Sequence, residues 1–139
     1  MSPRSVPLAD LHAYLDSYLR IREVPDDSNA LNGLQVENRG VVARVVGAVD
    51  ASQATIDGIT TARESGPALL LVHHGLFWDG SQPLTGRRYR RICGLLDRDA
   101  ALYSAHIPLD AHPEVGNNAV LARRLGLIDT EPFGNHKGV

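Results

Sequence analysis

The strongest constraint on the fold is a continuous run of five apolar residues, Ala68 to Val72. A strand with one face in water alternates apolar and polar residues, whereas a strand of a parallel sheet is covered on both faces and is apolar throughout. Gly66 and Pro67 end the preceding segment directly before this run. The run therefore predicts a buried strand in the middle of a mainly parallel sheet.

Helix and strand patterns alternate along the chain on both sides of this run. Apolar periodicity with capping and stop residues predicts helices over residues 8–19, 53–62, 89–97 and 117–125. Segments rich in β-branched or apolar residues predict further strands over residues 41–50 and 101–105. Asn32 and Gly33 predict a turn before a short strand. The alternation favours the α/β class, a three-layer sandwich with a mainly parallel sheet flanked by helices.

Length and composition exclude several classes of protein. The 139 residues are enough for one α/β domain, which we expect to cover residues 1–139. No apolar stretch approaches the roughly 18 residues of a membrane span, and the N-terminus lacks the apolar core of a signal peptide, so we expect a cytoplasmic protein. Cys93 is the single cysteine, which excludes a disulfide framework and a multi-cysteine metal site. A net charge of −2 makes nucleic acid an unexpected partner.

Histidines follow two of the predicted strands at the point where each strand ends. His73 and His74 come directly after the apolar run, His106 follows the next strand, and Asp110 lies four residues further on. The carboxyl ends of neighbouring parallel strands open onto one crevice, where α/β sheets bind their ligands. We therefore expect these four side chains to converge. Imidazole and carboxylate groups are ligands of zinc, iron and manganese alike, so the pattern does not choose the metal.

Adjacent histidines are poorly placed to chelate a single ion, but each can hold one ion of a pair. A carboxylate can then bridge the two ions, which lie roughly 3.5–4 Å apart in a two-metal site. The chain has to turn at Gly75 for both rings to face one cavity, because neighbouring residues of a strand point to opposite faces. The alternative is that the pair is an accident of packing or of the surface.

Other segments allow more than one interpretation. A basic cluster lies around the start of the third predicted helix, and its members are Arg87, Arg88, Arg90 and Arg91. A solvated helix face is favoured, with phosphate contact as the alternative. Phe77 and Trp78 suit the wall of a pocket or a subunit interface. His12 is expected to be a solvated helix residue and His112 a loop residue.

Four motifs together resemble those of the NIF-three-like family, whose members are also called dinuclear metal centre hexameric proteins or GTP cyclohydrolase type 2 homologues. The motifs are NGLQVE at 32–37, VDAS at 49–52, VHHGLFW at 72–78 and HIPLDAHPEVGNN at 106–118. The resemblance implies an α/β protomer in a toroidal hexamer with two divalent ions, zinc, iron or manganese, per complete site. It further implies that His73 and His74 each bind one ion, that Asp110 also ligates, and that His106 lines the site.

One departure from the family pattern concerns length. Members are usually longer and carry a final His and Glu, four residues apart, that complete the site, whereas no HxxxE occurs in this sequence. The chain therefore resembles the N-terminal half of such a protein. We expect a fragment, with a natural short form as the alternative.

The expected function is that of a metal-dependent hydrolase acting on a small molecule that the sequence does not identify. Two ions would activate a water molecule, and His106 is the candidate catalytic base. The alternatives are a non-catalytic metal-binding or protein-interaction hexamer, and an inactive truncated fragment. Self-association into a homo-oligomer is expected from the resemblance and from the apolar residues beside the histidines.

Overall fold

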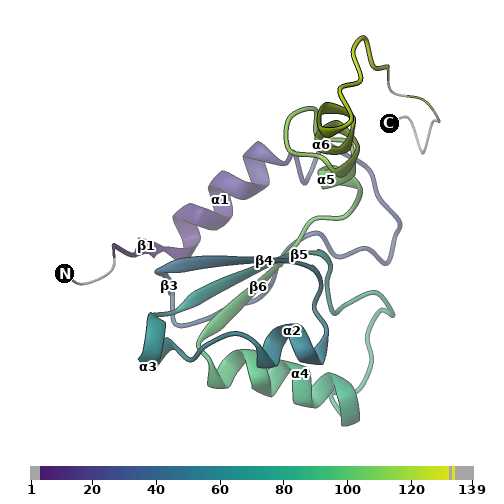
Figure 1. Cartoon of the computed structure of the whole chain (residues 1–139). Coiled ribbons are helices and arrows are strands. Elements are labelled where there is room, and N and C mark those ends of the chain that lie inside the picture. Colours follow the sequence, from purple (N-terminus) through teal and green to yellow (C-terminus); the bar gives the residue numbers. More distant parts are fainter. Residues whose placement is uncertain (1–3, 132, 134–139) are drawn as a thin grey trace.

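A four-stranded sheet forms the centre of the computed structural model, which describes residues 4–131 and 133 (Figure 1). Its strand order is β2-β6-β5-β4. The three parallel strands are β4 (Arg44–Asp50), β5 (Ala68–His74) and β6 (Ala100–Ser104). β2 (Gly33–Val36) follows the expected turn and pairs with β6 in the antiparallel direction. The predicted mainly parallel α/β sheet is confirmed.

Helices cover both faces of this sheet. α2 (Gln53–Asp57) and α4 (Gly86–Asp97) lie on one face, and α1 (Leu8–Tyr18) lies on the other (Figure 1). Leu70 packs with the α2 and α4 layer, whereas its neighbour Leu69 packs with the α1 layer. Both are fully buried, which explains why the run predicted from the sequence contains no polar residue.

Two segments that were each predicted as one element are split. The predicted strand over residues 41–50 is divided into β3 (Val41–Val42) and β4, because β3 pairs with β1 (Val6–Pro7) in a separate two-stranded sheet. The predicted helix over residues 53–62 ends at Asp57. A second short helix, α3 (Ala62–Ser65), begins after Thr61, whose hydroxyl and backbone form a capping box with Glu64.

The segments nearest the histidines also differ from prediction. β5 extends to His74, so both histidines belong to the strand rather than following it. α5 (Ile107–Asp110) occupies a stretch for which no helix or strand was predicted. Pro108 suits a first turn, and the carbonyl oxygen of His106 accepts backbone N–H bonds from Leu109 and Asp110. α6 (Asn117–Arg124) matches its predicted range within one residue and contacts α5. Among the described residues, none of the helices is long and apolar enough to cross a membrane.

Candidate metal centre

Three imidazole rings converge at the carboxyl end of β5 and β6. The ring centroids of His73 and His74 are 4.5 Å apart, and that of His106 lies 4.8 Å from His73 and 5.6 Å from His74. One nitrogen of each ring can be chosen so that all three lie within 4.8 Å of one another. The three histidines that were expected to converge at the carboxyl ends of the parallel strands therefore lie together. The cluster can hold a metal ion.

The end of β5 is held in place by a close contact at Gly75. A Cβ atom at Gly75 would overlap the side-chain amide of Gln35, so any larger residue there would displace that amide. The Gln35 Oε1 atom accepts a hydrogen bond of 2.8 Å from the backbone N–H of Leu76. Gln35 thus ties β2 to the turn that follows the two histidines.

The hydrogen bond of His73 assigns the tautomer of its ring. Its Nδ1 lies 3.1 Å from the carbonyl oxygen of Ala105. A carbonyl oxygen only accepts, so Nδ1 carries the proton and the neutral ring keeps a lone pair on Nε2. A lone pair on one nitrogen, with the other held by a protein acceptor, is the usual state of a metal-binding histidine.

The other two rings are held in the same way, but by carboxylates. His74 Nδ1 lies 2.7 Å from Asp50 Oδ1, and His106 Nδ1 lies 3.0 Å from Asp26 Oδ1. Each carboxylate orients its ring and holds the proton on Nδ1, as in carboxylate–histidine–metal arrangements. The three Nε2 atoms are therefore suited to bind a cation.

Asp26 is the most deeply buried of these carboxylates, with 5% of its side chain exposed. It accepts hydrogen bonds from Asn32 Nδ2 at 2.8 Å and from the backbone N–H of Ile107 at 3.0 Å, besides that of His106. Burial opposes its ionisation, but the hydrogen bonds from Asn32, His106 and the backbone outweigh it and hold the pKa of Asp26 below its ordinary value. The ionised carboxylate of Asp26 thus lies next to Nδ1 of His106.

Asp110 lies at the end of α5 and faces His73. Its Oδ2 is 3.5 Å from His73 Nε2, and its Oδ1 accepts a hydrogen bond of 2.7 Å from Asn117. Gly116 makes this possible, because a Cβ there would overlap carbonyl oxygens of the α5 turn. Two atoms with lone pairs face each other across 3.5 Å, an arrangement that a shared cation or a proton stabilises.

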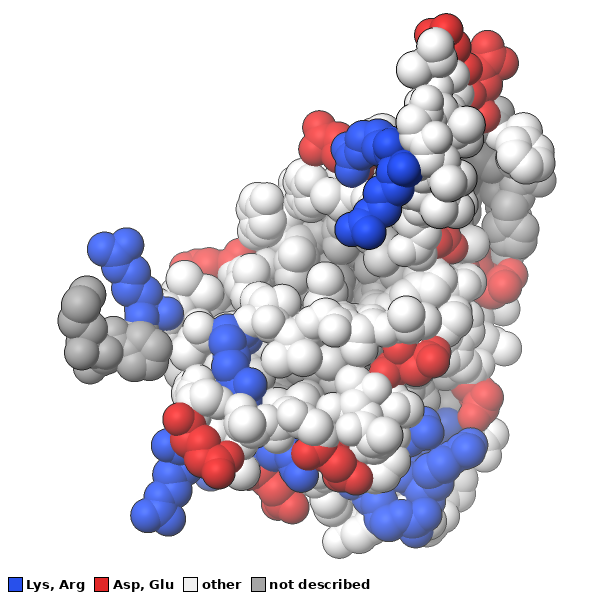
Figure 2. Space-filling model, viewed as in Figure 1, with Lys and Arg blue, Asp and Glu red and all other residues white. Residues whose placement is uncertain are grey.

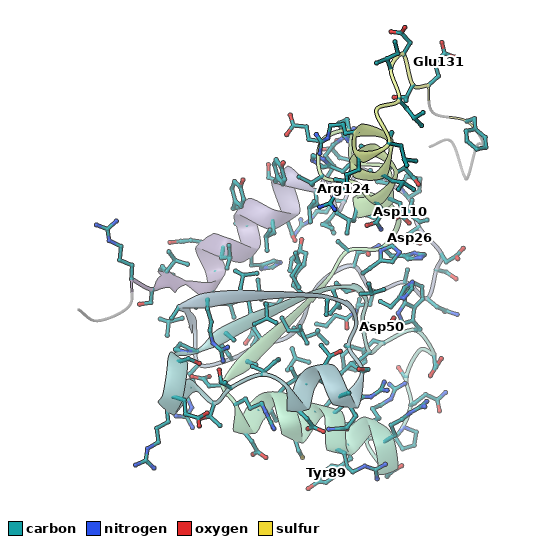
Figure 3. The ribbon with its side chains drawn as sticks, in the orientation of Figure 1. Asp26, Asp50, Tyr89, Asp110, Arg124 and Glu131 are labelled. Carbon is teal, nitrogen blue, oxygen red and sulfur yellow. The ribbon has the colours of Figure 1, made fainter. Side chains whose placement is uncertain are left out.

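The carboxylates of the site come from separate parts of the chain. Asp26 belongs to a loop, Asp50 ends β4 and Asp110 ends α5, and Figure 3 shows them around the same end of the sheet. Sequence reasoning missed Asp26 and Asp50. Asp50 had a usable signal, since it ends a parallel strand and pairs in register with His74. Asp26 had none, because it lies 80 residues from the histidine that it supports.

Trp78 forms one wall of the cluster. Its ring meets that of His106 edge to face, at 4.7 Å and 88°, and lies 6.0 Å from that of His74. Leu76 is buried, and Phe77 packs against the core on the α2 and α4 side of the sheet, so this segment is no exposed apolar surface. The pocket-wall interpretation of the two aromatic residues is the one that the geometry favours.

His12 and His112 lie outside the cluster, and their environments differ from expectation. His112 is buried, with Nε2 3.1 Å from the carbonyl oxygen of Tyr18 and Nδ1 accepting two backbone N–H groups. Both of its nitrogens are occupied, so its role is structural. His12 is half-buried rather than solvated and lies 3.2 Å from Asp16.

Comparisons with known proteins agree on one family. Residues 6–139 match the model of the family described as Duf34/NIF3 (NGG1p interacting factor 3). Proteins named GTP cyclohydrolase 1 type 2 homolog are similar: that of Deinococcus radiodurans is 50% identical over 93% of this chain and 47% of its own length. That of Treponema pallidum is 50% identical over 93% of this chain and 44% of its own. The chain spans about half the length of the curated relatives it matches.

A solved structure has the same fold. The crystal structure of a Thermus thermophilus protein superposes with a TM-score of 0.83 at 48% identity. The match covers 92% of this chain and 51% of the other.

Replacing Asp26 by Asn tests its role behind His106. Asp26→Asn removes the charge and the obligate acceptor, so His106 loses its fixed orientation; we expect affinity for manganese or zinc to fall by about 10- to 100-fold. Titration calorimetry measures this. Asp97→Asn, at the exposed end of α4 and so at the opposite end of the sheet, is the matched control and should bind as the unmodified chain does. Equal affinity of the two variants would contradict the assignment.

Proposed function

This chain belongs to the Duf34/NIF3 family, and from that premise we propose that it carries the histidine part of a dinuclear metal centre in a metal-dependent hydrolase. The observation that carries the proposal is the state of three clustered imidazoles. His73, His74 and His106 each bind a protein acceptor through Nδ1, which leaves the three Nε2 lone pairs for a cation.

Two features support a pair of ions rather than one. The rings of His73 and His74 are only 4.5 Å apart, so each can hold its own ion at the roughly 3.5–4 Å separation of two-metal sites. Asp110 is placed to bridge, because a carboxylate has two oxygen atoms and one of them already faces His73. Nitrogen and carboxylate donors suit zinc, iron and manganese equally.

Two bound ions would polarise a substrate oxygen and lower the pKa of a shared water molecule. The chain's own residues then have distinct tasks. Asp26 and Asp50 hold the rings of His106 and His74 in position, and Trp78 limits the access of water from one side. His106 was the base expected from the sequence, but its Nε2 cannot accept a proton while it binds a cation, so His106 is the third imidazole ligand in this proposal, with ionised Asp26 at its Nδ1.

The described residues provide too few ligands to complete the coordination of two ions. Three imidazoles and one carboxylate provide fewer ligands than two four-coordinate ions require. The remaining ligands would come from water, from a second chain or from the part of the family's length that this chain does not span. This shortage supports a second candidate function, a metal-binding protein without catalysis.

Metal content of three variants tests whether Asp110 bridges. Asp110→Ala should lower occupancy of both ions, whereas His73→Ala or His74→Ala should lower mainly one, because an imidazole nitrogen binds a single ion. Elemental analysis of the metal-loaded chain gives the ratio, with circular dichroism as the folding control. Asn117→Ala removes the partner of Asp110 but keeps the carboxylate, so it should retain more metal than Asp110→Ala. Unchanged metal content in the Asp110→Ala variant would contradict the bridging role of Asp110.

Hydrolysis is tested with a panel of nucleotides and phosphoesters. We expect turnover with added manganese or zinc and none after treatment with a chelator. His106→Ala should lower both the metal content and the rate, because it removes one of the three imidazole ligands. Bound metal without turnover of any panel member would favour the non-catalytic alternative.

We also propose that the chain forms a homo-oligomer, and its exposed apolar surface supports this. β4 is an edge strand, and Val45 and Val49 on its α1-facing side are 55% and 64% exposed. Exposed apolar residues on an edge strand are typical of surfaces that bind another chain. Light scattering should therefore give a multiple of the protomer mass, and Val45→Glu should lower it. A monomer at high concentration would contradict self-association.

A further inference from the structure

A second cavity lies beside the metal centre, between the loop before β2 and the segment after β5. Its volume is about 440 Å³, and hydroxyl, amide and aromatic side chains line it, among them Ser28, Asn29, Phe77, Ser81 and Gln82. Among the described residues around it, Arg88 is the one charged side chain. A cavity with a cation, several neutral hydrogen-bonding groups and no carboxylate in its wall is suited to an anion.

Arg88 is held ready for such a ligand. Only 14% of its side chain is exposed, and its guanidinium lies 5.7 Å from the centre of the Phe77 ring. Its ion-pair partner is Asp79, at 3.4 Å, whose side chain is 76% exposed. The Arg88 side chain is therefore largely removed from water, lies over an aromatic face and donates a hydrogen bond to a solvated carboxylate.

Positive charge is concentrated around this point. Four arginines occupy the first two turns of α4: Arg87, Arg88, Arg90 and Arg91. Figure 2 shows blue side chains gathered at the lower right, over the start of this helix. In the described part of the chain, the buried Nε of Arg91 has no hydrogen-bond partner. Arg87 and Arg90 form the solvated helix face that the sequence favoured, whereas Arg88 and Arg91 are half-buried.

The two segments that line the cavity, residues 28–31 and residues 77–82, each adjoin residues that contact the histidine cluster. Residues 28–31 lie between Asp26 and Asn32, and Asn32 accepts a hydrogen bond of 2.8 Å from the backbone N–H of His106. Phe77 precedes Trp78, whose ring contacts His106 and His74. Residues that line the cavity are thus sequence neighbours of residues that contact the histidine cluster.

We propose that this cavity binds the phosphate group of a phosphorylated small molecule whose reacting part lies at the metal centre. The inference deepens the proposed function and rests on it for the identity of the second part. A phosphate group presents several acceptor oxygens, which match the planar guanidinium fork together with neighbouring hydroxyl and amide donors. The volume is within the range of pockets for small ligands.

Calorimetric titration of the metal-free chain with inorganic pyrophosphate tests the site without interference from bound metal. We expect saturable binding that Arg88→Gln weakens by at least about tenfold, since a charge-assisted hydrogen bond is lost. Asp79→Asn should instead tighten binding, because the carboxylate no longer competes for the guanidinium. Arg90→Gln, exposed on the same helix and outside the cavity wall, is the matched control and should have no effect.

Three results would overturn the proposal: no binding of pyrophosphate, equal weakening by Arg88→Gln and Arg90→Gln, or equally tight binding of malonate. The opposite effect of Asp79→Asn guards against a loss that merely reflects unfolding. Elemental analysis of the same variants separates this proposal from the metal centre. If the chain binds pyrophosphate but no metal, the proposed function is wrong and the anion cavity is supported. If it binds metal but no pyrophosphate, only the anion cavity is wrong.

Discussion

The parallel pairing of β5 with β4 on one side and β6 on the other is the constraint on which the candidate site depends. This register sets Asp50 opposite His74 and brings the end of β6 beside His73, whose Nδ1 lies 3.1 Å from the carbonyl oxygen of Ala105. Apolar side chains on both faces of β5 fix the register, because a slip by one residue would turn each of them toward the opposite layer. The cluster is thus positioned by the core and not by loops alone.

Grouping three imidazoles in this way has an electrostatic cost without a cation. Each ring has a protein acceptor at Nδ1, one nitrogen of each of the three rings lies within 4.8 Å of the others, and Asp110 adds a carboxylate oxygen 3.5 Å from His73 Nε2. Ionised Asp26 behind His106 increases the negative potential further. Such an arrangement is poor for stability and good for binding a positive ion, which is the balance typical of functional sites.

Charge around the site is distributed unevenly. Asp26, Asp50 and Asp110 lie around the imidazoles (Figure 3), whereas the arginines are gathered at the start of α4 (Figure 2), where Arg88 lies over the Phe77 ring. A substrate with an anionic end and a neutral reacting group would be oriented by this separation, since its charged end is favoured only on the arginine side. The anion cavity and the metal centre therefore act as two ends of one recognition surface.

The sequence by itself determined the central strand, the α/β class and the convergence of three histidines, because these follow from local apolar patterns and from the geometry of parallel strands. It did not determine where elements break, as at Ala43 and Gly58, where pairing with β1 and helix capping decide. Only the tertiary structure showed that the Asp26 carboxylate accepts a hydrogen bond from His106 and that Arg88 lines a cavity near the histidine cluster. The physical reason is that a loop takes its conformation from partners far away in the chain, whereas the burial of a strand is already recorded in its own residues.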